Sequence, residues 1–202
     1  MIGKWNKSVI LSYIGLNLSV LGMFLVIRGN NIKYVQVCLM IAGICDLFDG
    51  TVARRCKRTK EEKLFGIELD SLVDVVNFLA FPVVILMALG LNKIYYLPIY
   101  ILYVLFGVAR LAYFNITVED DNKPRKYYDG LPVTFSAMIF PLVYLLNYVL
   151  KQEIFNIVYP LTMLLVSILF VLKIKIPKPK LKASLVLLLT AIVVSIMYLF
   201  VL

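Results

Sequence analysis

Two pairs of aspartates are the residues of this sequence whose type and spacing best suit chemistry. Asp46 and Asp49 lie three residues apart, and Asp70 and Asp74 lie four apart. In a helix, either spacing places both side chains on one face. Each pair sits at the end of a long apolar run, and an ionisable side chain at membrane depth is costly unless it is paired or binds an ion. The four carboxylates therefore predict a cation site.

The elements that carry these pairs must bring them to the same depth. If the first helix reaches water near Arg54 and the second leaves it near Leu64, a rise of about 1.5 Å per residue puts all four carboxylates about 8 to 15 Å deep. Like charges that meet there need positive charge between them. Because the chain has no histidine, oxygen ligation favours Mg²⁺ or Mn²⁺ over zinc. We expect two divalent cations.

The residues between the two pairs indicate what the cations would hold. Gly50 and Ala53 share the helix face of Asp46, and their small size lets a ligand approach the backbone. Arg54 adds a planar donor that suits phosphate oxygens. Gly66 is expected to open the second helix, where free N–H groups and the helix dipole favour an anion. This combination predicts a diphosphate site.

The order of these residues resembles the signature of the CDP-alcohol phosphatidyltransferases. The matching residues are Asp46-x-x-Asp49-Gly50-x-x-Ala53-Arg54 and Gly66-x-x-x-Asp70-x-x-x-Asp74. Eleven residues separate Arg54 from Gly66, which is more than the usual family spacing. Because the extra residues fall in the polar run 55–63, we expect a longer surface loop, which costs little free energy.

Three further segments resemble the phosphatidylserine synthases within this family. They are FGIELDSLVDVV (Phe65 to Val76), ARLAYFN (Ala109 to Asn115) and GLPVT (Gly130 to Thr134). Leu79 and Phe81 are bulkier than the residues common in the run that follows the first segment, so local packing there is expected to differ. Asn77 shares the face of Asp70 and Asp74 and is expected to border the site, whereas Glu68 points away.

The resemblance implies an activity and a role for each motif residue. A phosphatidyl group would pass from CDP-diacylglycerol to the hydroxyl of L-serine, with release of CMP. Asp46, Asp49, Asp70 and Asp74 would hold the metals, and Asp74 would also act as general base. The same resemblance assigns CDP binding to Gly50, Ala53, Arg54 and Gly66.

Arg110 is a fixed positive charge inside an apolar run, and it is our candidate for binding the serine carboxylate. Three alternatives stay open for this side chain. It could snorkel to the membrane interface, contact the lipid phosphate or serve helix packing.

Composition predicts an all-α, polytopic membrane helix bundle with one domain over residues 1–202. The chain is 62% hydrophobic and its mean hydropathy is +0.91, values that exclude an ordinary soluble domain. We expect about seven transmembrane helices, a six-helix family core and a C-terminal helix. The apolar runs are 8–27, 34–54, 64–91, 95–114, 131–150, 154–172 and 183–201.

The basic residues predict how this bundle lies in the membrane. With the N-terminus inside and the C-terminus outside, 16 of the 21 Lys and Arg residues are cytoplasmic, as the positive-inside rule requires. The carboxylates then lie near the cytoplasmic face. Attraction to anionic lipid head groups explains the net charge of +9 better than nucleic-acid binding does. Apolar outer faces would permit a homodimer.

Two alternatives remain for function. A small ion or proton transporter would also keep carboxylates in the membrane, but it leaves Gly50, Ala53, Arg54 and Gly66 unexplained. Within the enzyme class, the acceptor could be glycerol 3-phosphate or inositol phosphate. These acceptors need extra cations for a phosphate group, which Lys123, Arg125 and Lys126 could supply.

Overall fold

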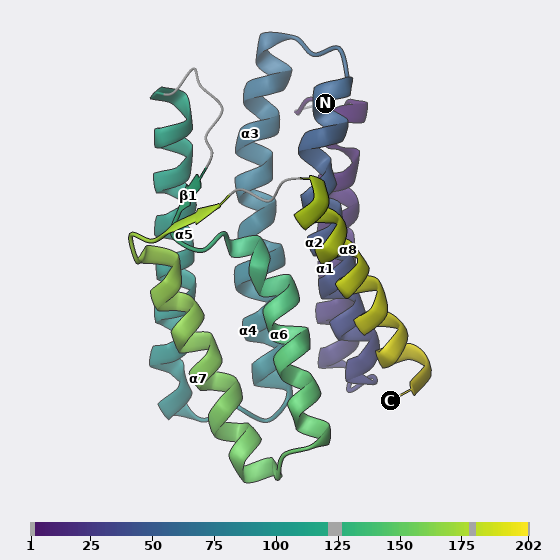
Figure 1. The fold of residues 1–202 in the computed structure, drawn as a ribbon, viewed down its shortest axis with the longest axis vertical. Helices are drawn as coiled ribbons and strands as arrows, with labels where there is room; N and C mark the ends of the chain where they lie inside the picture. The colour runs from purple at the N-terminus through teal and green to yellow at the C-terminus, as the bar shows by residue number, and fades with distance from the viewer. Residues whose placement is uncertain (1–2, 121–126, 178–180, 202) are drawn as a thin grey trace.

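The computed structural model of this protein describes residues 3–120, 127–177 and 181–201, and it is a bundle of helices that run mostly along one long axis (Figure 1). Six helices are long and apolar enough to cross a membrane, and a shorter apolar helix covers Val133–Tyr148. These features confirm the predicted polytopic helix bundle. The α-helices are α1 (Ile10–Ile27), α2 (Ile32–Arg55), α3 (Lys60–Asp74), α4 (Phe81–Ala88), α5 (Leu97–Asp120), α6 (Ser136–Tyr144), α7 (Gln152–Val171) and α8 (Leu181–Ile196).

The connection between α2 and α3 is shorter than predicted. The prediction of a surface loop over the whole run 55–63 is wrong, because α2 continues to Arg55 and α3 already begins at Lys60. Thr59 caps α3: its hydroxyl accepts from the Glu62 N–H at 3.2 Å, and the Glu62 carboxylate accepts from the Thr59 N–H at 2.7 Å. This capping box satisfies two free N–H groups and stabilises an early helix start.

A π-helical segment, Val75–Ala80, joins α3 to α4 directly after Asp74. Pro82 follows it, and a proline ring inside a helix displaces the carbonyl four residues earlier. That carbonyl belongs to Phe78, and it accepts instead from the Tyr103 hydroxyl at 2.6 Å and from Ser136 Oγ at 3.2 Å. The wide turn below Asp74 is therefore tied to α5 and to α6.

Two glycines on neighbouring helices make room for the bulky residues of this segment. A Cβ atom on Gly107 of α5 would lie 2.3 Å from Leu79 Cδ2, and one on Gly22 of α1 would lie 2.2 Å from Phe81 Cζ. Both distances are far below van der Waals contact, so the large side chains occupy space that only glycine leaves free. The unusual residues at 79 and 81 are thus compensated by their partners.

Aromatic side chains fill the part of the core that lies between α5, α6 and α7. Tyr103 and Phe140 pack edge to face, as do Phe140 and Tyr159. Tyr198, which follows α8 in a second π-helical segment (Met197–Val201), also belongs to this core. We call the three fully buried tyrosines of the described residues, Tyr103, Tyr159 and Tyr198, the tyrosine core.

A small sheet was not predicted. Strands β1 (Tyr127–Asp129) and β2 (Lys175–Pro177) pair antiparallel, with Tyr128 opposite Ile176. Gly130 follows β1 with φ of +74°, and a Cβ there would lie 2.4 Å from the Phe170 carbonyl oxygen. Only glycine fits both constraints, and this turn leads the chain into the GLPVT segment and α6.

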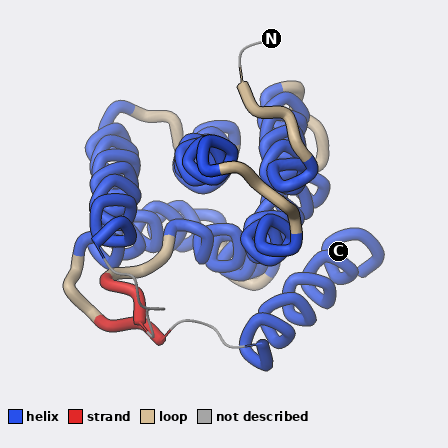
Figure 2. Tube along the Cα trace, turned by 90° about the horizontal axis from the view of Figure 1, so that it is seen from above, coloured by secondary structure: helices blue, strands red, loops and turns tan. Residues whose placement is uncertain are grey.

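The connections between helices separate to the two ends of the bundle. Figure 1 shows the α2–α3 connection and the N-terminus toward one end, and the turns α1–α2, α4–α5 and α6–α7 at the other. Viewed along the long axis, α8 lies at the edge of the bundle (Figure 2), where it contacts α2 and α6.

Candidate functional site

Three of the four aspartates meet between α2 and α3. One carboxylate oxygen from each of Asp46, Asp49 and Asp70 lies within 4.8 Å of the others, and all three residues are half-buried. The helical spacing of the aspartates predicts this convergence, because two antiparallel helices with acidic faces at equal depth must place those faces together. Three carboxylates this close form a set of oxygen donors suited to a divalent cation.

Asp74 lies beside this group, one helical turn further along α3 from Asp70. Its side chain is buried and shares a hydrogen-bond contact with the Asp46 carboxyl group. Its Oδ1 atom is also buried and has no hydrogen-bond partner among the described residues. A buried polar atom without a partner costs free energy, so this oxygen fits the role of a cation ligand. We call Asp46, Asp49, Asp70 and Asp74 the carboxylate site.

Two hydroxyl groups support the carboxylate site from other helices. Ser12 of α1 donates from Oγ to Asp49 Oδ2 at 3.1 Å, and the Thr134 hydroxyl hydrogen-bonds Asp46. Sequence reasoning assigned neither role. A signal was present for Ser12, because Ser8, Ser12 and Ser19 recur at helical spacing in an apolar run.

The small residues of α2 leave its surface open toward the end of the helix. The nearest atom to a Cβ built on Gly50 is Arg54 Nη1, at 3.4 Å. Arg54 is exposed and donates from Nη2 to Thr51 Oγ1 at 3.0 Å, so its guanidinium lies along its own helix. Ala53 is half-buried one turn beyond Asp49 on the same helix.

Gly66 does not begin the second helix. The prediction that it offers free N–H groups of a helix start to an anion is therefore wrong. Because α3 begins at Lys60, Gly66 is its seventh residue, and the free N–H groups lie a turn and a half earlier. Gly66 still shares the face of Asp70, four residues on. A Cβ there would meet only Arg58 Nη1 at 3.8 Å and Val9 Cγ1 at 4.0 Å. Gly66 therefore leaves space beside the carboxylate site.

Arg110 lies inside the bundle rather than at an interface, which argues against snorkelling. It is only 7% exposed, its guanidinium stands 5.0 Å from the Phe114 ring centroid, and its Nε atom has no hydrogen-bond partner in the described chain. Asp74 and Asp46 both attract it electrostatically. Arg110 is thus a buried cation beside the carboxylate site.

The burial of Asn77 and the exposure of Glu68 agree with the directions predicted for these two side chains. Asn77 is buried with a free Oδ1 atom among the described residues, and its Nδ2 atom lies 3.2 Å from where Gly15 would carry a Cβ. Glu68 is exposed, in line with its predicted outward direction. Ser71 and Asn115 hydrogen-bond each other and join α3 to α5 beside the site.

Comparison with known proteins gives consistent results. The family model for CDP-alcohol phosphatidyltransferase matches residues 5–201. A CDP-diacylglycerol–serine O-phosphatidyltransferase of Saccharomyces cerevisiae is 38% identical over 120 residues, which cover 55% of this chain and 42% of the relative. One from Helicobacter pylori is 33% identical over 132 residues, covering 63% and 53%. An archaetidylserine synthase of Methanothermobacter thermautotrophicus is 27% identical over 160 residues, covering 78% and 66%. The chain thus spans about half the length of the first two relatives.

Proposed function

The chain belongs to the CDP-alcohol phosphatidyltransferase family, and on that premise we propose that it transfers a phosphatidyl group from CDP-diacylglycerol to L-serine. The observation that carries this proposal is the convergence of Asp46, Asp49 and Asp70 within 4.8 Å, at positions that match the family signature. The relatives named as serine phosphatidyltransferases support the choice of serine as acceptor.

The carboxylate site would hold two divalent cations, Mg²⁺ or Mn²⁺. Its donors are all oxygens, and the free Oδ1 of Asp74 offers a ligand atom that no described protein group uses. When bound, the cations would neutralise the charge that develops on the diphosphate during phosphoryl-type transfer.

The side chains would then place the two substrates. Gly50, Ala53 and Gly66 leave room for the CDP group, and Arg54 can turn from Thr51 to meet its diphosphate. Arg110 would bind the carboxylate of serine, next to Asp74. That arrangement sets the serine hydroxyl beside the proposed base.

The reaction itself is one displacement at phosphorus. Asp74 takes the proton of the serine hydroxyl while that oxygen forms a bond to the lipid-linked phosphorus. The bond from this phosphorus to the bridging oxygen of CMP breaks, and CMP leaves with the electron pair. The chain contains no histidine, so a carboxylate is the natural base in this site.

We also infer that the site faces the cytoplasm, with the N-terminus inside and the C-terminus outside. The α2–α3 connection, which is rich in Lys and Arg, lies toward the same end of the bundle as the N-terminus with Lys4 and Lys7 (Figure 1). This grouping supports the positive-inside orientation. A homodimer stays a prediction.

An acceptor panel tests the proposal. Purified protein in detergent or vesicles, supplied with CDP-diacylglycerol and Mg²⁺ or Mn²⁺, should release CMP when serine is added. Release with glycerol 3-phosphate or inositol phosphate instead would contradict the choice of acceptor. Lys123, Arg125 and Lys126, the cations considered for those acceptors, lie outside the described residues. The transporter alternative predicts no release with any acceptor.

A further inference from the structure

Arg58, in the short connection between α2 and α3, is placed beside the carboxylate site without belonging to the family signature. Its Nη1 atom lies 3.8 Å from the position of a Cβ on Gly66. Its Nε atom is buried and makes no hydrogen bond within the described residues. At least one donor of this guanidinium is therefore left unpaired by the described residues.

The position of Arg58 relates it directly to the carboxylate site. Gly66 lies four residues before Asp70 on the same face of α3. The Arg58 guanidinium beside Gly66 is therefore about 6 Å, or one helical turn, from Asp70 along the helix axis. On the facing helix α2, Arg54 Nη1 lies 3.4 Å from the Cβ position of Gly50. One guanidinium therefore lies beside Gly50 and the other beside Gly66, the glycines that flank the carboxylates on α2 and α3.

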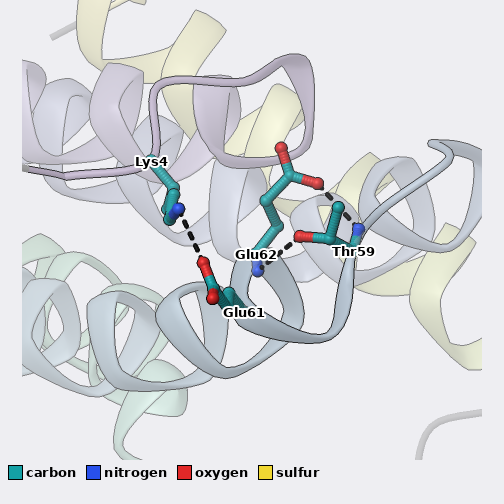
Figure 3. Close-up of polar contacts among 4 residues, drawn as sticks. All are labelled: Lys4, Thr59, Glu61 and Glu62. Atoms are coloured by element: carbon teal, nitrogen blue, oxygen red, sulfur yellow. Dashed lines mark hydrogen bonds and ion pairs between the residues drawn. The ribbon is translucent and has the colours of Figure 1, made fainter.

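The carboxylates nearest to Arg58 in sequence are already engaged by other groups. Glu61 forms an ion pair with Lys4 at 2.8 Å, and Glu62 accepts from the Thr59 N–H in the capping box (Figure 3). Asn6 also hydrogen-bonds Glu62. These contacts fix the start of α3 and the N-terminal segment against each other, and among the described residues neither Glu61 nor Glu62 forms an ion pair with Arg58.

We propose that Arg58 binds the diphosphate of CDP-diacylglycerol, as a second guanidinium besides Arg54. A planar guanidinium suits two phosphate oxygens at once. This inference rests on the proposed function, because it assumes that a cytidine diphosphate group occupies the space beside Gly50 and Gly66.

The test compares binding of CDP to purified variants by isothermal titration calorimetry in the presence of Mg²⁺. Arg58→Gln should weaken CDP binding at least about tenfold, a typical effect for loss of a charge-assisted contact. In turnover assays the same variant should raise KM for CDP-diacylglycerol, with KM for serine and kcat within about twofold of wild type. Arg55→Gln is the matched control, because Arg55 is an exposed neighbour and the variant loses the same charge.

The outcomes distinguish the proposed role of Arg58 from the proposed function of the protein. Equal CDP affinity in Arg58→Gln and Arg55→Gln overturns the role of Arg58 while the proposed function stands. Failure of the wild-type protein to bind CDP overturns both. Should Arg58→Gln not fold, Arg58→Lys serves instead: it keeps the charge but loses the two-pronged geometry, so CDP binding should weaken by a smaller factor. Unchanged binding in that variant contradicts the proposal.

Discussion

The tyrosine core and the carboxylate site both bury polar groups inside the helix bundle, but only the first satisfies them internally. The hydroxyl of Tyr103 donates to the Phe78 carbonyl at 2.6 Å, that of Tyr159 to the Phe140 carbonyl at 3.4 Å, and that of Tyr198 to the Pro141 carbonyl at 2.5 Å. Each bond uses a backbone acceptor near a helix irregularity. The tyrosine core is therefore complete without any ligand.

The carboxylate site, in contrast, contains a buried polar atom that lacks a hydrogen-bond partner among the described residues. Asp74 Oδ1 within the site is buried without a hydrogen-bond partner among the described residues, as are Asn77 Oδ1 and Arg110 Nε outside it. Buried polar groups are nearly always paired in folded proteins, so the unpaired oxygen of Asp74 supports the proposal that this region receives ions and substrates, whereas the tyrosine core serves stability. Substitutions in the two regions should accordingly affect different properties.

The largest effect is expected from Asp74→Asn. Loss of a general base typically costs 10²- to 10⁴-fold in rate, and we expect CMP release to fall by at least about 10³-fold. The melting temperature should hold or rise, because the variant removes a buried charge that metal-free protein must accommodate. CMP release and thermal unfolding measure the two effects. The exposed Glu68→Gln serves as control, and full activity of Asp74→Asn would rule out its role as base.

A smaller and more selective effect is expected from Arg110→Lys. An ammonium group cannot reproduce the planar contact of a guanidinium with a carboxylate, so the apparent KM for serine should rise about tenfold. The KM for CDP-diacylglycerol should change little. Initial rates over a matrix of both substrate concentrations distinguish these results, and an unchanged KM for serine removes the proposed contact.

The tyrosine core should show the opposite behaviour. Tyr103→Phe removes one of two donors to the Phe78 carbonyl and should lower the free energy of unfolding by about 1 kcal/mol. Turnover should stay within about twofold of wild type, because the second donor, Ser136, still holds the turn below Asp74. Denaturant unfolding and CMP release test both parts. A large loss of activity without loss of stability would show that the two regions are not separate.

The smallest effect is expected at the surface, from Lys4→Gln. The hydrogen bond and charge of Glu61 raise the pKa of Lys4 above its usual value of 10.5. The stabilisation by this pair is therefore fully present below the unfolded pKa and is lost as the pH rises through the folded pKa. Melting curves of wild type and variant should differ slightly at pH 8 and converge as the pH rises through the folded-state pKa of Lys4. A constant difference across this range would contradict the pairing.

Sequence periodicity was enough to predict the helix bundle and the carboxylate site. Asp46 with Asp49, and Asp70 with Asp74, lie on single helix faces by backbone geometry alone, and the depth of each pair follows from its distance to the polar residues. The capping box of Thr59 and Glu62 was also readable and would have corrected the position of Gly66, because it marks the start of α3.

Other features depend on contacts that no local pattern encodes. The π-helical turn after Asp74 needs Tyr103 and Ser136 from two other helices to satisfy the Phe78 carbonyl. The hydrogen bond from Ser12 to Asp49 joins residues 37 positions apart. The pairing of β1 with β2 likewise joins two segments that are far apart in sequence, so periodicity within either segment could not predict it.

The most direct test of the central claim is anomalous diffraction from crystals grown with Mn²⁺, recorded at the manganese absorption edge. The account predicts two anomalous peaks within ligand distance of the Asp46, Asp49, Asp70 and Asp74 carboxylates, and their loss in Asp46→Asn crystals. Crystals that bind Mn²⁺ elsewhere, or that show no peak among these four side chains, would contradict it.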